Sequence, residues 1–291
     1  KPVIVRKTNN AYKVNFTGTN ELNTTGYQVV FTTGDDEAAF VAPTSAFAVT
    51  GADDFKVFPR DAATSGYVYN ADELNAALNN PSISTITLQT GEYGTIVAKS
   101  NKTIIGTPGA KVDCVHLNGA DNLTLKNINF DAANAKVFCH KNGTEQGYAN
   151  IFTATKDNNP NKGAWNLVIE GCTFSGDFQN NGVAIAFYDQ HRGDGQSRDI
   201  TIKNCTFEAI NSVYHIYGHY FGGGEMNIEN NIFATDTAGP NIYLGRYQSS
   251  VPVKVYGNTF MTATSLENAM VLQDHSNYGV SIDASNNTFT N

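Results

Sequence analysis

The sequence predicts an all-β solenoid in which the strands of successive turns lie side by side and run parallel. The main observation is a short motif, made of two apolar residues, a polar corner and a Phe, that occurs six times. The six Phe residues, spaced by 44, 33, 26, 27 and 29 positions, are Phe130, Phe174, Phe207, Phe233, Phe260 and Phe289. The shortest spacings are close to one turn of a solenoid, and a repeat of this length buries its apolar face only by stacking on its neighbours.

Each aligned position of the motif has a physical interpretation. Apolar residues such as Ile200 and Ile202 stand seven and five positions before the Phe, and this alternation predicts a strand with one face inside. Only Asn or Gly stands three positions before it, so we expect a corner with positive φ there. Two positions before the Phe we expect an inward ladder of like residues. The ladder residues are Ile128, Cys172, Cys205, Asn231, Asn258 and Asn287.

Over roughly residues 65–291 this pattern resembles the right-handed parallel β-helix of the pectate-lyase-like superfamily. In that family a bent corner with stacked Asn joins the second and third sheets, which implies that Val213–Phe221 is a strand of the first sheet. The segment Ser100–Phe130 also resembles the opening turns of pectate lyases. The resemblance concerns the fold and names no substrate. Ca²⁺ is implied as a cofactor by the family alone.

The chain divides into two parts. Residues 1–63 are rich in β-like segments outside the repeat, and we expect a small sandwich-like module or a remnant of one. Residues 64–291 form the predicted β-helix domain. Within it, residues 70–80 predict one helix, because Asn70 can cap it, Glu73 stands at the capping-box position, and apolar residues recur at helical spacing. We expect this helix to cover the N-terminal end of the coil, where an exposed edge would invite association.

The composition narrows the class of partner. The formal net charge is −8, which argues against nucleic acid. An acidic polymer would be repelled as well, unless local basic residues or a bound cation compensate. No apolar run approaches the length of a membrane span. Charged residues make up only 16% of the chain, while Asn, Thr and Gly are abundant, which favours a solenoid of short strands and tight turns over a helical protein. A β-solenoid rich in Thr and Asn in turn favours a secreted or cell-surface protein.

The four cysteines predict no zinc site, because no two of them form a CxxC motif. Cys172 and Cys205 occupy the same ladder position in successive turns. We interpret both as small buried residues, since Cys behaves as a compact apolar side chain in protein cores. The pattern leaves open whether a disulfide joins their adjacent turns.

The candidate site is the outer face of the first sheet. Four strands of this sheet, one in each of four turns, can be aligned with one another. In each strand we expect one aligned residue to point inward, and these residues are Phe187, Ile216, Leu244 and Leu272. Adjacent turns lie about 4.8 Å apart, so the outward neighbours of these residues would form one patch rich in Tyr and His. Insertions at 156–165 and 189–198 would wall one side of the patch. The residues expected to bind substrate are Lys156, Trp165, Tyr188, Asp189, His191, Arg192, Tyr247, Gln273, Asp274 and His275.

The patch also contains the residue types that cleave a uronic-acid polymer by β-elimination. Such a lyase needs a base for the proton α to the carboxylate, a group that neutralises this carboxylate, and an acid for the leaving oxygen. Arg246 is the residue predicted to hold the carboxylate. His219 or His215 is the predicted base. Tyr217 or Tyr243 is the predicted acid, and the aromatic rings would stack on sugars. The structural alternative is that these Tyr and His residues only stack between turns.

A glycoside hydrolase of this fold would need a pair of carboxylates at a fixed separation. Asp189 and Asp274 would lie about 14 Å apart by the strand spacing, which is too far, although Asp194 could approach Asp189. The group of carboxylates that holds calcium in pectate lyases is not evident in this sequence. The Arg-containing motif of that family is not recognisable either.

We therefore expect a secreted or surface polysaccharide lyase that cleaves a uronic-acid-containing glycan in a groove on the first sheet and so serves polysaccharide degradation. Two alternatives stay open. A non-catalytic glycan-binding surface protein would use the same aromatic patch. A viral tailspike or adhesin domain would share the fold.

Overall fold

The structure is a computed structural model that describes residues 5–8, 11–14, 29–31, 38–40, 66–139, 145–153, 163–188, 197–219, 221–275 and 277–290. The chain separates into two units, Lys1–Tyr67 and Val68–Asn291. The first unit contains two antiparallel pairs of strands. These strands are β1 (Val5–Thr8), β2 (Ala11–Val14), β3 (Val29–Phe31) and β4 (Ala38–Phe40).

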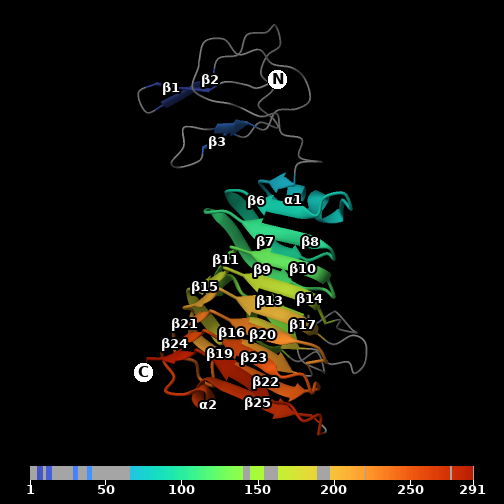
Figure 1. Cartoon of the computed structure of the whole chain (residues 1–291). Helices are drawn as coiled ribbons and strands as arrows, with labels where there is room; N and C mark the ends of the chain where they lie inside the picture. The colour runs from blue at the N-terminus through green and yellow to red at the C-terminus, as the bar shows by residue number, and fades with distance from the viewer. Residues whose placement is uncertain are drawn as a thin grey trace. The chain divides into compact units, whose positions relative to one another are not determined.

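A nine-stranded sheet forms one side of the second unit (Figure 1). The strand order is β26-β23-β20-β17-β14-β10-β8-β6-β5, and every pair from β6 to β26 is parallel. The strands are β5 (Tyr67–Val68), β6 (Thr85–Leu88), β8 (Lys102–Gly106), β10 (Asp121–Lys126), β14 (Trp165–Glu170), β17 (Arg198–Lys203), β20 (Met226–Glu229), β23 (Val253–Tyr256) and β26 (Ile282–Ser285).

A fourteen-stranded sheet supplies the remaining faces as two arms that meet at β9 (Ala110–His116). The first arm carries β7 (Gly91–Val97), β12 (Lys136–Cys139), β13 (Glu145–Phe152), β16 (Asp177–Tyr188), β19 (Ile210–His219), β22 (Ile242–Tyr247) and β25 (Met270–Asp274). The second arm carries β11 (Asn129–Asp131), β15 (Thr173–Ser175), β18 (Thr206–Phe207), β21 (Ile232–Phe233), β24 (Thr259–Phe260) and β27 (Thr288–Phe289). In the first arm β12 pairs antiparallel with β13.

The stacked Phe residues of the motif form one continuous column inside the coil. Successive ring centroids lie 4.7 to 5.3 Å apart, and successive ring planes differ by only 3 to 8°. The register explains this, because β15, β18, β21, β24 and β27 pair Phe with Phe in every turn. The prediction of an all-β chain with stacked parallel turns is therefore confirmed, and this arrangement fits a parallel β-helix.

The corner of each motif adopts the left-handed backbone that its Asn or Gly indicates. All six corner residues have φ between 53° and 64°. They are Asn127, Gly171, Asn204, Asn230, Gly257 and Asn286. Beside the corner runs the expected Asn ladder. The side-chain amide of Asn231 donates to Asn258 Oδ1 at 3.0 Å, and the amide of Asn258 donates to Asn287 Oδ1 at 3.1 Å. Each of these polar groups is thus paired inside the coil, as a buried amide must be.

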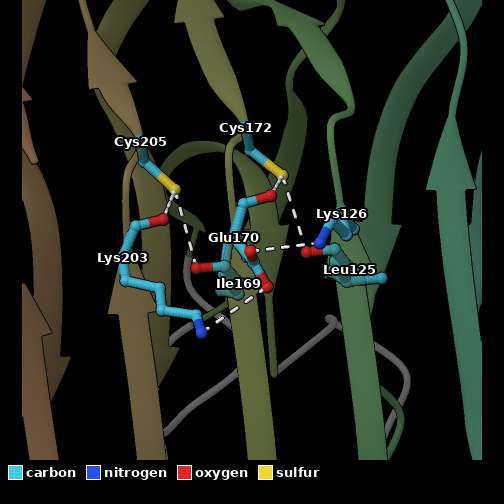
Figure 2. A network of polar contacts seen from close by, with 7 residues as sticks. All are labelled: Leu125, Lys126, Ile169, Glu170, Cys172, Lys203 and Cys205. Carbon is cyan, nitrogen blue, oxygen red and sulfur yellow. Dashed lines mark hydrogen bonds and ion pairs between the residues drawn. The ribbon is translucent and has the colours of Figure 1, made fainter.

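Cysteines occupy the same ladder position in two earlier turns (Figure 2). Cys172 and Cys205 are free thiols and are almost fully buried, which confirms their interpretation as small core residues. The thiol of Cys205 contacts the carbonyl oxygens of Lys203 at 3.3 Å and Ile169 at 3.6 Å. On the outside of the same strands, Glu170 lies between Lys126 and Lys203. This arrangement joins three turns by ordinary surface ion pairs, which contribute little to stability.

Helix α1 (Ala71–Asn79) forms where the sequence predicts it. The backbone N–H of Glu73 donates to Asn70 Oδ1 at 2.9 Å, and the Glu73 carboxylate accepts at 2.8 Å from the N–H of Tyr69, the residue before the cap, which is a variant of the capping box. The ammonium group of Lys102 lies below the end of this helix, and it donates to the carbonyl oxygens of Ala77, Asn80 and Ile83. The described residues also form the 3₁₀ turn η1 (Ala132–Asn134) and the short helix α2 (Leu266–Ala269). Within the described residues, no helix has the length and apolar character needed to cross a membrane.

Candidate functional site

The candidate site is a row of aromatic side chains on the outer face of the first arm. It is positioned by the register of β16, β19 and β22, which pairs Tyr217 with Tyr243 and Tyr188 with His219. Because alternate residues of a strand point to opposite faces, these side chains lie outside while their neighbours fill the core. The aromatic row comprises Tyr188, Tyr214, Tyr217, His219 and Tyr243.

The rings of the aromatic row stack on one another. The ring centroids of Tyr217 and Tyr243 lie 5.8 Å apart, and those of Tyr188 and His219 lie 5.2 Å apart. Within the row the interplanar angles range from 13 to 30°. Ring faces are therefore largely occupied by other rings, and Tyr188 is only 1% exposed, so it presents almost no surface to a ligand. The row offers a ligand mainly the ring edges and polar atoms of its partly exposed members, Tyr214, Tyr217, His219 and Tyr243. This differs from the stacking of sugars on open ring faces that the sequence suggests.

Two glycines make room for these rings. A Cβ atom on Gly245 would lie 2.7 Å from Cε1 of Tyr243 and 3.0 Å from Cδ2 of His219. A Cβ atom on Gly239 would lie 2.6 Å from Cε1 of Tyr214. Both distances are shorter than a normal carbon–carbon contact, so a side chain at either position would displace a ring.

Burial keeps the phenols of Tyr188, Tyr214 and Tyr217 protonated, because it raises the pKa of each. It raises the pKa of Tyr188 to about 12, and the nearby Arg246 guanidinium offsets part of this effect. Burial raises the pKa of Tyr217 well above its usual range, and the neighbouring tyrosines raise it further. Burial also raises the pKa of Tyr214. At neutral pH these hydroxyls are hydrogen-bond donors and not bases. The hydroxyl of Tyr243 donates to Gln273 Oε1 at 2.9 Å.

Arg246 brings a positive charge to the row from an unusual backbone position. The pairing of β22 with β25 shifts register between Leu244 and Tyr247, and within this bulge Arg246 has a φ of 51°. A left-handed backbone is unfavourable for Arg, and such strain often marks functional positions. The bulge leaves the Arg246 side chain exposed, with its charge close enough to affect both Tyr188 and Tyr217.

His215 does not lie on this face, so the prediction that it is an exposed catalytic base is wrong. Its side chain is 0% exposed and lies in the core, between the rings of Phe207 and Phe233. A bulge in β19 is the cause, because the N–H groups of His215 and Ile216 both donate to the carbonyl oxygen of Asn241. The strand alternation is broken there, and both residues point inward. Burial lowers the pKa of His215 to about 3.

The same bulge corrects the predicted alignment of the first sheet. Ile216 pairs with Ile185 and Ile242, whereas Gly218 takes the position opposite Phe187 and Leu244. The shift brings Tyr214 to the outside, next to Tyr217, and the sequence analysis did not include this residue in the site. The signal available in the sequence was the run of tyrosines at positions 214, 217 and 243, which simple period-two alignment could not place together.

Tyr247 is also misplaced by the sequence analysis, since it is 0% exposed and stacks inside on Phe221 at 5.3 Å. Strict alternation from the inward Leu244 would point residue 246 inward and residue 247 outward. The bulge at Arg246 adds one residue, so Tyr247 points inward instead. Its hydroxyl has no hydrogen-bond partner among the described residues, and burial raises its pKa. Tyr247 therefore cannot contact a ligand on the outer face.

The other predicted site residues have varied positions. Lys156, Asp189, His191 and Arg192 lie outside the described residues. Trp165 begins β14 in the nine-stranded sheet, where the guanidinium of Arg198 lies 3.7 Å from its ring centroid.

The three predicted residues at the end of β25 lie close to the row. Gln273 is exposed and pairs with Tyr243 as described above, and His275 is partly exposed. Asp274 accepts backbone N–H groups from Tyr278 and Gly279 at 3.0 and 2.9 Å. Its carboxylate therefore stabilises a turn, which is a structural role.

The described residues bring together no set of three or more His, Cys, Asp or Glu side chains that could hold a metal ion. The Ca²⁺ that the family resemblance implies thus finds no suitable carboxylate cluster in that part of the chain, since calcium prefers six to eight oxygen ligands.

Comparisons with known proteins add little to this description. No protein-family model matches the chain, and no curated protein matches it. Among solved structures, the chain is similar to the Streptococcus pneumoniae surface protein and adhesin PfbA, with 10% sequence identity. The match covers 79% of this chain and 96% of that chain, with a TM-score of 0.28. A superposition of this quality is too poor to support any statement about function.

Proposed function

We propose that the aromatic row and Arg246 form a binding surface for an acidic polysaccharide, on a secreted or cell-surface protein. The observation that carries this proposal is an exposed guanidinium beside a line of protonated phenols. Carboxylates accept hydrogen bonds from both kinds of group, and pairs with Arg are strong because they are charge-assisted. The positive charge of Arg246 also offsets, at this surface, the repulsion between an anionic polymer and a protein with a net charge of −8.

Adjacent strands present these donors at intervals of about 4.8 Å along the coil, so an extended polymer would contact several turns at once. The proposal includes the right-handed sense of the coil, the division of the chain near residue 64, and the role of α1 in covering the end of the coil. The family resemblance implies the right-handed sense, whereas the division follows from where the repeat ends and the covering role of α1 from the edge that the coil would otherwise expose.

Binding can be tested by calorimetry with polygalacturonate and alginate as acidic polymers and with a neutral glucan for comparison. We expect the acidic polymers to bind and the neutral one not to bind at the row. Arg246→Ala should weaken binding at least tenfold, and added salt should weaken it further. Tyr217→Phe, which keeps the ring and removes a donor, should weaken binding several-fold. Tyr247→Phe removes a buried hydroxyl and serves as the matched control.

A second candidate function is β-elimination of a uronic-acid polymer on the same surface. The observation that favours it is the position of His219, whose ring contacts both Tyr188 and Tyr217 in the row that Arg246 borders. His219 would remove the proton α to the carboxylate, Arg246 would hold that carboxylate, and Tyr243 would protonate the leaving oxygen as the double bond forms.

The two functions can be separated by measuring ultraviolet absorbance from the unsaturated product. Growth of this absorbance that disappears in His219→Ala, with binding retained, would establish the lyase. Binding without new absorbance would leave the non-catalytic surface protein. Equal binding by wild type and Arg246→Ala would refute both, because both depend on the cation.

A further inference from the structure

A depression lies at the corner between the two arms of the fourteen-stranded sheet, apart from the aromatic row. Its main part has a volume of about 1150 Å³, and an adjoining part measures about 380 Å³. The two parts share Asp236, Thr237 and Thr262, so they form one continuous groove. The groove spans the turns from Asp177 to Thr262, which is three strand spacings, or roughly 14 Å.

An irregularity in β16 builds one end of this groove. Asp177 pairs with Ile210 and Gly182 pairs with Ser212, so four residues of β16 oppose Asn211 alone. The Phe178 ring fills the space where a Gly182 side chain would be. Phe178 and Gln179 thereby form a wall. The opposite end is formed by Thr264 and Asn268, at helix α2.

The lining of the groove is rich in hydrogen-bond acceptors. Thr237 Oγ1 donates to the carbonyl oxygen of Gly239, so its oxygen is left to accept, whereas Thr235 Oγ1 donates to the carbonyl oxygen of Ala209 and also contacts His215 Nε2 at 3.1 Å. Asp177 accepts one bond, from the amide of Asn211 at 2.7 Å, and Asp236 is exposed. Among the described residues no Lys, Arg or His lines the groove.

Apolar surface alternates with these acceptors. The side chain of Ile210 is 50% exposed in the groove, and its backbone pairs with that of Asp177. A ligand that fits must therefore combine many uncharged donors with an apolar face, which describes a pyranose ring with its ring of hydroxyls. A basic peptide could form ion pairs with the two carboxylates but would make no use of the rest of the lining. The two carboxylates also lie two turns apart, roughly 10 Å. An acidic sugar would be repelled by both.

We propose that this groove is a second carbohydrate site, one that binds neutral oligosaccharides. The carboxylates of Asp177 and Asp236 accept hydrogen bonds from sugar hydroxyls, and Ile210 contacts the apolar face of a ring. The inference goes beyond the proposed function of the aromatic row, because it concerns different residues and the opposite charge preference.

Ligand-observed NMR and calorimetry with maltohexaose, cellohexaose and xylohexaose test this proposal. We expect at least one of these neutral oligosaccharides to bind. Asp236→Ala and Ile210→Ser should each weaken binding about tenfold or more. Asp283→Asn changes an exposed carboxylate on the nine-stranded sheet, and Arg246→Ala changes the aromatic row, and both should leave the affinity unchanged.

Thermal unfolding of each variant shows whether the fold is kept, and Asp236 is an exposed residue whose replacement leaves the core intact. Failure of all three oligosaccharides to bind would overturn the proposal. Equal losses in Asp236→Ala and Asp283→Asn would overturn it as well. Displacement of the bound oligosaccharide by oligolysine at lower concentration would assign the groove to basic peptides instead. None of these results depends on whether acidic polymers bind the aromatic row.

Discussion

The thiol of Cys205 and the side-chain amide of Asn231 take equivalent positions in adjacent turns and contact equivalent carbonyl oxygens. Cys205 Sγ lies 3.6 Å from the carbonyl oxygen of Ile169, and Asn231 Nδ2 lies 2.9 Å from that of Ile202. Asn231 Oδ1 in turn accepts the backbone N–H of Cys205 at 2.9 Å. The coil therefore contains one polar ladder in which strong amide donors replace weak thiol donors toward the C-terminal turns.

This relationship predicts that Cys205→Asn extends the ladder by one turn. The new amide would donate to the carbonyl oxygen of Ile169 and accept the backbone N–H of Cys172. Replacing a weak hydrogen bond by a full one should raise the free energy of unfolding by about 1 kcal/mol. Urea denaturation measures the effect, and Cys205→Leu, which overpacks the same site, should lower stability. A marked loss of stability in Cys205→Asn would contradict the equivalence of the two positions.

The buried His215 predicts a loss of stability in acid. Its pKa is about 3 in the folded state, below the value of 6.5 that it has when exposed, so the unfolded chain binds the extra proton. Its contribution is fully present above pH 6.5 and is lost as the pH falls toward 3, at about 1.4 kcal/mol per pH unit. The difference in unfolding free energy between wild type and His215→Gln should therefore shrink between pH 6.5 and 4. Parallel stability curves for the two proteins would show that His215 does not titrate in this way.

Lys102 should be essential for holding α1 on the coil. Its ammonium serves three carbonyl oxygens at the end of the helix and just beyond it, and its side chain is only 5% exposed. Lys102→Met keeps the shape and leaves these carbonyl oxygens without their donor, so we expect a loss of about 2 kcal/mol or more. Lys99→Met, at an exposed position nearby, should cost almost nothing. Hydrogen exchange at Leu74 and Leu78 would show whether the helix loosens first.

We expect replacement of Arg246 by Gly to lower the affinity for acidic polymers without lowering the stability of the fold. Its left-handed backbone costs roughly 1 kcal/mol for any residue with a Cβ atom, and Gly avoids this cost. Arg246→Gly should therefore match or exceed the wild-type melting temperature while losing affinity for acidic polymers. Arg246→Ala should lose affinity equally and gain no stability. If Arg246→Gly proved clearly less stable than Arg246→Ala, the backbone conformation would not be a source of strain.

The repeat could be predicted from the sequence because it depends on regular alternation and on corner residues with special backbone needs. The Phe column and the φ values at positions such as Asn204 follow directly from it. The failures at His215 and Tyr247 share one cause, since each follows a bulge where a single extra residue reverses the alternation. Such bulges depend on contacts between turns distant in the chain, and one-dimensional spacing does not record them.

An outer ladder was missed for a different reason. Asn122 Nδ2 donates to Asn101 Oδ1 at 2.9 Å, and Asn166 Nδ2 donates to Asn122 Oδ1 at 2.7 Å. Asn122 and Asn166 stand one position before the aligned apolar pairs, and all three residues have positive φ, so part of the signal was present in the repeat. The groove could not be foreseen, because it arises from the unequal lengths of neighbouring strands at the corner.

The unbroken Phe column has a consequence for how such a protein can change in length. Phe207 and Phe233 are separated by 26 residues, and the intervening segment carries Tyr214, Tyr217 and His219. Copying this segment once would insert one complete turn of the coil. The strand pairing of the turns on either side would be kept, because each turn contacts only its neighbours. The molecule would grow by about 4.8 Å and would carry one more set of tyrosines. Its reach along a polymer is thus adjustable by duplication alone, with no redesign of the interior.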